Sequence, residues 1–256
     1  MFLNRGLKNC EIKEYELNKY SNDFKIMKND YYEIYYPIKY ENYIKEVLDY
    51  STNKLIENLN FFNKKFDGNI INIIKASFFD DKEDFLNRIK ELDVKAKPPK
   101  WARGCFYGNE NQILIDSNNL SASFYTLAHE TFHLLFKKFI YNNYSNRIVW
   151  LDESFAYIFC LPKDEIESDN RIINIIKKYK NLKDIPIISN ITFEKNNIET
   201  KKYDAYDFFQ IIGYYLVRVY SKEELLELYK NEKRIVKLGK TILTASILYF
   251  KKKYNL

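Results

Sequence analysis

The only two histidines of the chain lie four residues apart, in the segment His129-Glu130-Thr131-Phe132-His133. Apolar residues around them recur at helical spacing, which predicts a helix over 121–140. Positions i and i+4 share one helix face, with Cβ atoms about 6 Å apart. Two imidazoles at that separation can bind one tetrahedral Zn²⁺ at about 2.0–2.1 Å. Glu130 lies beside the first histidine, close enough to accept a proton from a water molecule. The segment therefore predicts a metal site with His129 and His133 as ligands.

A catalytic zinc site needs a third protein ligand, and the chain has no third histidine. The candidates are Asp152 and Glu153, which lie in an apolar segment whose neighbours indicate burial. A buried carboxylate needs a partner, and a metal ion is a suitable one. The 19 residues between His133 and Glu153 allow one helix to end, a polar loop to turn and a second helix to pack back. We prefer Glu153 as the ligand and keep Asp152 as the alternative.

The rest of the chain changes character near residue 117. Residues 1–30 are polar and show no clear period. Aromatic and β-branched runs predict strands over 31–38 and 70–79 and a hairpin with arms 101–107 and 112–116. Helical spacing predicts helices over 41–66, 80–92, 121–140, 147–160, 165–179, 203–219, 222–229 and 241–253. The fold class we expect is α+β, with a mixed-sheet N-terminal lobe and a helical C-terminal lobe. Residues 1–98 would form an N-terminal α/β segment and residues 99–256 the core of the site, within one compact unit.

Composition excludes several classes of protein. No run of 18 apolar residues is present, so we expect no membrane-spanning helix. Charges occur throughout the first 25 residues, which argues against a secretory signal. Three widely spaced cysteines, Cys10, Cys105 and Cys160, fit reduced thiols better than a disulfide framework. These features together favour a cytoplasmic protein that is not bound to a membrane.

The formal net charge of +6 suggests a nucleic-acid partner, but the residue types argue against one. Of the 41 basic residues, 34 are lysine, whereas surfaces that read phosphates favour the bidentate fork of arginine. The longest basic runs flank predicted helices, where solvated helix faces account for them. We therefore expect no nucleic acid among the partners.

Two segments carry a resemblance to a known family. His129-Glu130-Thr131-Phe132-His133 is followed by Trp150-Leu-Asp-Glu-Ser-Phe-Ala156, and the pair resembles the gluzincin metallopeptidases, the thermolysin-like and zinc-aminopeptidase-like enzymes. The second motif of that family typically reads W-L-N-E-G-F-A, so Asp152 and Ser154 depart from it. Thermolysin-type enzymes usually have an aspartate four residues after the ligand glutamate, and that position is Tyr157 here.

The resemblance implies a zincin-like catalytic domain that hydrolyses peptide bonds. It implies one Zn²⁺ per chain held by His129, His133 and Glu153, with Glu130 as the general base. The partner it implies is a peptide or protein substrate. Amino- and endopeptidase activity, the substrate, the metal used in the cell and the oligomeric state all remain open.

Two weaker features extend the resemblance. In such folds an edge strand ahead of the metal helix pairs with the substrate backbone, and the hairpin at 101–116 has that place in the chain. Its Gly108-Asn109-Glu110-Asn111 turn is similar to an aminopeptidase motif whose glutamate binds the substrate amine, although a plain β-turn explains Glu110 better. The resemblance also implies a tyrosine directed at the scissile carbonyl, for which Tyr206 is the first choice and Tyr203 the second.

A rival reading is a binding module that captures peptides without cleaving them. An intact Glu130 argues against it, because a scaffold has no need of a base at that position.

Overall fold

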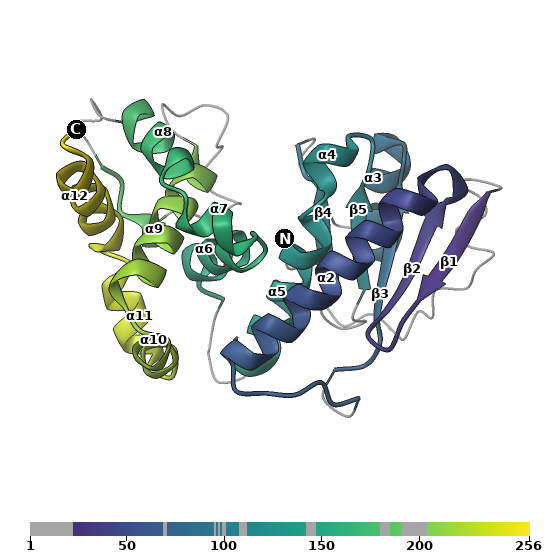
Figure 1. The fold of residues 1–256 in the computed structure, drawn as a ribbon, viewed down its shortest axis with the longest axis horizontal. Helices are drawn as coiled ribbons and strands as arrows, with labels where there is room; N and C mark the ends of the chain where they lie inside the picture. Colours follow the sequence, from purple (N-terminus) through teal and green to yellow (C-terminus); the bar gives the residue numbers. More distant parts are fainter. Residues whose placement is uncertain are drawn as a thin grey trace. The chain divides into compact units, whose positions relative to one another are not determined.

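The computed structural model describes residues 23–68, 71–94, 96, 98, 101–107, 112–141, 147–179, 185–190 and 204–256. The chain divides into two units, Met1–Lys138 and Phe139–Leu256. Figure 1 draws both units. The predicted limits of the catalytic core, 99–256, concern function and stay a prediction.

The first unit contains a five-stranded sheet. Its strands are β1 (Phe24–Lys28), β2 (Tyr32–Pro37), β3 (Ile74–Phe79), β4 (Gly104–Tyr107) and β5 (Gln112–Asp116). They lie in the order β1-β2-β3-β5-β4. The β2–β3 and β3–β5 pairs are parallel, and the β1–β2 and β4–β5 pairs are antiparallel. The expected α+β class with a mixed sheet is therefore confirmed.

Helices cover both faces of this sheet. On one face, Phe79, Leu114 and Cys105 pack against α3 (Lys82–Leu92). Side chains alternate along a strand, so Tyr32 of β2 points to the opposite face from Tyr35, which joins the α3 cluster. The Tyr32 hydroxyl reaches the other two long helices of the unit, α2 (Glu41–Phe61) and α5 (Thr126–Phe139). The predicted metal helix therefore lies against a buried sheet face.

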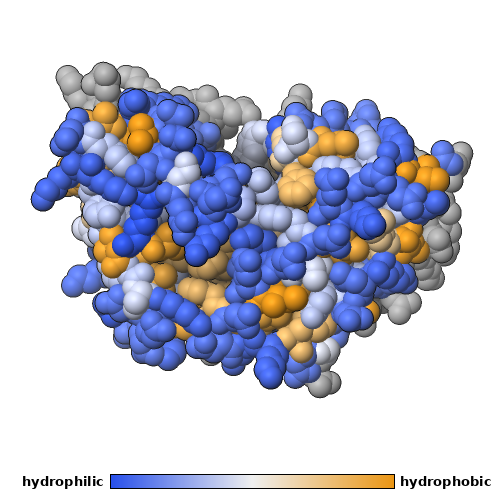
Figure 2. All heavy atoms as spheres, in the orientation of Figure 1, coloured by the Kyte–Doolittle hydropathy of each residue, from blue (hydrophilic) through white to orange (hydrophobic). Residues whose placement is uncertain are grey.

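Helix α2 follows a short 3₁₀ turn, η1 (Ile38–Tyr40), and is amphipathic. Its buried residues include Ile44, Val47 and Leu48, and Figure 2 shows mostly hydrophilic side chains over the surface of this helix. The helix ends at Phe61, five residues before the predicted end at 66. Asn63 adopts a positive φ of 54°, a left-handed conformation that a helix cannot continue through.

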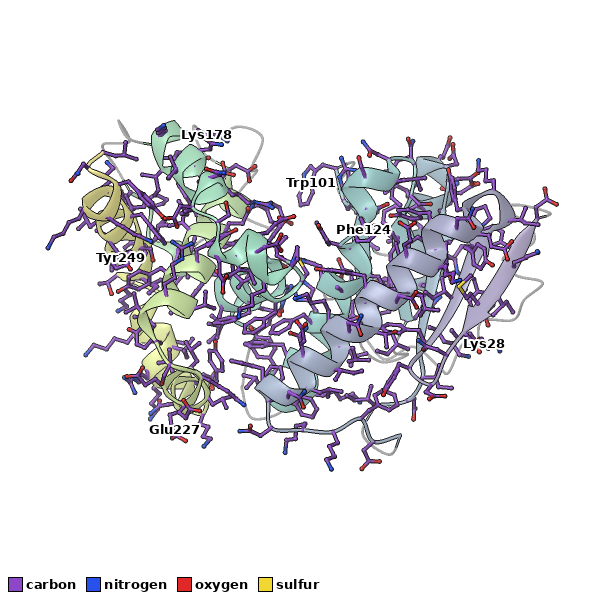
Figure 3. All side chains as sticks on the ribbon, in the orientation of Figure 1. Lys28, Trp101, Phe124, Lys178, Glu227 and Tyr249 are labelled. Carbon is purple, nitrogen blue, oxygen red and sulfur yellow. The ribbon has the colours of Figure 1, made fainter. Side chains whose placement is uncertain are left out.

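The predicted helix over 121–140 is two helices in the structure. Asn119 caps α4 (Leu120–Ser123) by accepting a hydrogen bond from the backbone N–H of Ala122, and α5 begins at Thr126. Phe124 lies in the break between them (Figure 3). Its ring packs against Tyr43 and Tyr50 of α2. This aromatic packing accounts for the chain turning there instead of extending one regular helix.

The described part of the second unit is helical. Its elements are α6 (Val149–Phe159), α7 (Lys163–Glu167), α8 (Asn170–Lys178), η3 (Ile188–Asn190), α9 (Ala205–Val219), α10 (Lys222–Tyr229), α11 (Glu232–Leu238) and α12 (Ile242–Tyr254). Helices α6, α8 and α12 all pack against α9. A Cβ added at Gly213 of α9 would lie 2.4 Å from the Ser154 carbonyl oxygen, so glycine lets α6 and α9 approach closely.

None of the helices in the described ranges combines the length and the apolar content needed to cross a membrane.

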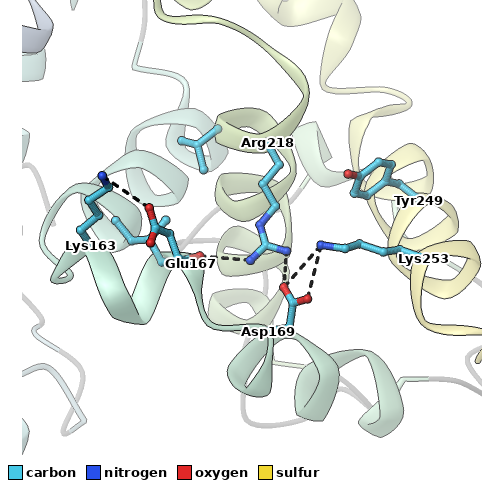
Figure 4. Close-up of a pocket in the computed structure, with 8 residues that line it drawn as sticks. Lys163, Glu167, Asp169, Arg218, Tyr249 and Lys253 are labelled. Carbon is cyan, nitrogen blue, oxygen red and sulfur yellow. Dashed lines mark hydrogen bonds and ion pairs between the residues drawn. The ribbon is translucent and has the colours of Figure 1, made fainter.

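A pocket of about 550 Å³ opens in the second unit beside an ion cluster of Asp169, Arg218 and Lys253 (Figure 4). The histidines of the predicted metal site do not line this pocket.

Candidate metal centre

Helix α5 is fixed on its buried side by contacts with β2 and α2. The Tyr32 hydroxyl donates toward Thr131 Oγ1 at 3.1 Å and toward the Ser51 carbonyl oxygen at 3.3 Å. Burial raises the pKa of Tyr32, so the hydroxyl keeps its proton and remains a donor. The Phe132 ring packs against Phe62 of the segment that follows α2. Both Thr131 and Phe132 lie between the two histidines, so these contacts hold the part of the helix that carries the motif.

The two imidazoles meet as their spacing predicts. The Nε2 atoms of His129 and His133 are 3.2 Å apart, and the rings lie edge to face with centroids 4.8 Å apart. Two nitrogens at about 2.05 Å from a tetrahedral ion are about 3.3 Å apart, which matches this separation. A hydrogen bond in which one imidazole donates to the other has the same length. The geometry therefore suits a shared ion and is also compatible with a shared proton.

Glu130 completes the group. His129, Glu130 and His133 each offer one ligand atom, and these three atoms lie within 4.8 Å of one another. Among the described residues this group could hold a metal ion. The Glu130 side chain is buried, and its Oε2 has no hydrogen-bond partner within the described structure. An unpaired buried carboxylate oxygen is costly, and a nearby cation or water relieves that cost. Two imidazole nitrogens beside a carboxylate form a donor set that fits Zn²⁺.

The predicted third ligand lies in the second unit. Glu153 and Asp152 are both buried on α6, and Arg147 contacts both. Its Nε lies 2.6 Å from Asp152 Oδ2, and its Nη2 lies 2.9 Å from Glu153 Oε1. Burial by itself would lower the pKa of Arg147, but the carboxylates of Asp152 and Glu153 outweigh it and raise the pKa. The assignment of Glu153 as a zinc ligand stays a prediction.

Tyr206 lies in the same unit, on the first turn of α9. Asp204 caps this helix by accepting a hydrogen bond from the Tyr206 backbone N–H at 2.9 Å. The Tyr206 ring packs edge to face on Tyr157 of α6, with centroids 5.6 Å apart. Burial, and after it the negative charge of Glu153, raise the pKa of Tyr157 well above its ordinary value. Tyr157 therefore connects the neighbourhood of Glu153 with Tyr206.

The remaining predicted residues are Glu110, Tyr203 and the three cysteines. Glu110 and Tyr203 lie outside the described residues, as does Cys10. Cys105 and Cys160 are buried free cysteines, and neither belongs to the metal-binding group.

Three residues that contact residues of the predicted site motifs were not themselves predicted from the sequence. Gly104 of β4 lies against Glu130, Tyr32 anchors α5, and Arg147 pairs with the acidic residues of α6. The one local signal was an arginine six residues before Glu153 in a chain with few arginines. The positions of Gly104 and Tyr32 depend on contacts between segments far apart in the chain.

Comparison with known proteins adds no family assignment: no protein-family model matches the chain, and no curated protein matches it.

Proposed function

We propose that the chain is a zinc-dependent peptidase of the gluzincin type, with a zincin-like catalytic domain. The observation that carries the proposal is the grouping of His129, Glu130 and His133 on α5. Their two imidazole nitrogens have the separation of ligands on one tetrahedral ion, and a buried carboxylate lies beside them.

Each residue has a defined role in this proposal. His129 and His133 would hold the ion, and Glu153 would be the third ligand. A bound Zn²⁺ supplies Lewis-acid chemistry, since it lowers the pKa of a water molecule from about 15.7 toward 7. Glu130 would accept a proton from a water molecule whose oxygen adds to the peptide carbonyl carbon. It would then pass that proton to the nitrogen of the leaving amine as the C–N bond breaks. The Tyr206 hydroxyl donates a hydrogen bond to the oxygen that becomes negative.

Strand β4 is the proposed place for the substrate backbone. It is an edge strand of the described sheet, paired with β5 alone. An edge strand offers backbone N–H and C=O groups with which an extended peptide can pair. Gly104 at its start lies against Glu130, so a peptide along β4 would pass close to the base. The substrate class is therefore an extended peptide segment.

The substitution Glu130→Gln tests the proposal. It keeps the shape of the side chain and removes the base, so zinc should remain bound at one ion per chain. The rate of peptide cleavage should fall by roughly 10²–10⁴. Glu57→Gln, an exposed residue of α2, is the matched control and should leave the rate unchanged. Cleavage of a defined peptide library with identification of product ends provides the assay, and it also separates amino- from endopeptidase activity. Near-normal cleavage by Glu130→Gln with zinc bound would refute the mechanism.

The second candidate function is peptide capture without hydrolysis. It is favoured by the Arg147–Glu153 pair, which gives the predicted third ligand a partner that is not a metal. A chain that binds zinc and peptide but yields no products from the library would support this alternative.

A further inference from the structure

Gly104 opens strand β4 at the point where it faces helix α5. A Cβ built on this glycine would lie 2.5 Å from Glu130 Oε1, 2.9 Å from Glu130 Cγ and 2.6 Å from Thr126 Cγ2. Contacts below 3.0 Å are essentially never made by real Cβ atoms. Any side chain here would therefore overlap the carboxylate of Glu130.

The backbone itself does not call for glycine at this position. No glycine in the described residues has a positive φ. Gly104 is an ordinary strand residue that pairs with Ile115 of β5. The requirement is one of space: the missing side chain leaves the volume that the Glu130 carboxylate occupies.

We propose that Gly104 is a positioning residue for Glu130, and this inference rests on the proposed peptidase function. The segment of α5 around the motif is held by Tyr32 on Thr131 and by Phe62 on Phe132, so it cannot move away easily. A methyl group at position 104 would instead rotate the Glu130 side chain. The three nearest atoms belong to Glu130 and Thr126. The added methyl group should therefore displace the Glu130 carboxylate and leave the two histidine side chains in place.

The kinetic test uses Gly104→Ala in the full chain loaded with Zn²⁺. We expect one bound zinc per chain, an unchanged KM and a fall in kcat of about 10²-fold, the typical cost of displacing a catalytic group by about 1 Å. Gly68→Ala is the control, because a Cβ at that glycine meets nothing within 4 Å. It should leave kcat and KM unchanged. In a Glu130→Gln background, Gly104→Ala should cause no further loss of rate, since the base through which it acts is already gone.

A stability cycle tests the contact without using activity. Gly104→Ala should lower the urea midpoint of the zinc-free protein, and Glu130→Ala should restore much of that loss by removing both overlapping Glu130 atoms. Equal losses from Gly104→Ala with and without the Glu130 side chain would show that the contact is wrong. A wild-type kcat for Gly104→Ala would overturn the positioning role. If the variants show the stability coupling but the wild-type protein cleaves no peptide, the peptidase proposal fails and Gly104 is a packing residue only.

Discussion

Arg147 and Glu153 form a partly buried ion pair, with 2.9 Å between Nη2 and Oε1. The same guanidinium also binds Asp152, so one positive charge faces two carboxylates. These three side chains together carry a formal charge of −1. Arg147 therefore neutralises one of the two buried carboxylates and leaves one negative charge that a cation would balance.

The identity of the third ligand can be tested on these two carboxylates. If Glu153 binds zinc, Glu153→Ala should lose the metal on dialysis, because two imidazoles alone bind it weakly. Asp152→Ala should keep most of the metal, since Asp152 is bound by Arg147 Nε. Metal analysis after dialysis measures both. If Asp152→Ala loses the metal and Glu153→Ala keeps it, our choice between the two is wrong.

Local patterns in the sequence predicted most of the elements in the described ranges. The spacing of Ile44, Val47 and Leu48 indicated α2, and alternating or β-branched runs indicated β2, β3 and the β4–β5 hairpin. Strand β1 was missed because its FKIMK sequence lies in a polar region and forms an edge paired with β2 alone. The charged sequence of α11 concealed another helix, since Ile235 is its one buried residue in the structure.

Breaks between consecutive helices were also missed by the sequence-based prediction. The region from Glu165 to Tyr179 looked like one helix, but Ser168 is extended and separates α7 from α8. Asp169, which follows it, is bound by Arg218 of α9 and Lys253 of α12. Contacts of this kind join residues far apart in the chain, and no local pattern encodes them.

In the candidate site, too, local spacing could be predicted from the sequence and contacts between distant segments could not. The meeting of His129 and His133 followed from helix geometry, because residues four apart share a face. The space that Gly104 leaves for Glu130 depends on how a strand packs on a helix, and the sequence offered no sign of it.

Tyr206→Phe tests the proposed oxyanion donor. Loss of one such donor typically costs about 10²–10³ in kcat. The phenyl ring should preserve the packing on Tyr157, so folding and zinc content should match the wild type. Peptide-cleavage kinetics measure the effect, with Tyr203→Phe assayed in parallel. A silent Tyr206→Phe together with a damaging Tyr203→Phe would move the role to Tyr203 and leave the peptidase proposal standing.

Tyr32→Phe should destabilise the first unit by about 1–3 kcal/mol, because buried hydrogen-bonding groups lose their partner. The affected acceptors are Thr131 Oγ1 and the Ser51 carbonyl oxygen. Urea unfolding followed by circular dichroism gives the free energy. Tyr31→Phe is the neighbouring control, since the Tyr31 ring packs edge to face on Phe66 and the substitution keeps that ring. Equal stability of the two variants would show that the Tyr32 hydroxyl does not anchor α5.

Asp169 should make the stability of the second unit depend on pH in the acid range. Burial alone would raise the pKa of Asp169, but hydrogen bonds from Tyr254 and Arg218 outweigh it and hold the pKa below its ordinary value of 3.8. A lowered folded pKa means that the stabilisation is fully present above pH 3.8 and is lost as the pH falls through the folded pKa. Asp169→Asn should therefore be less stable than wild type near pH 6, and the difference should shrink below pH 3.8. Urea titrations across that range measure it, with Glu167→Gln as the control because its pair with Lys163 is exposed. A difference that stays constant from pH 6 down through the acid range would show that the charge of Asp169 contributes nothing.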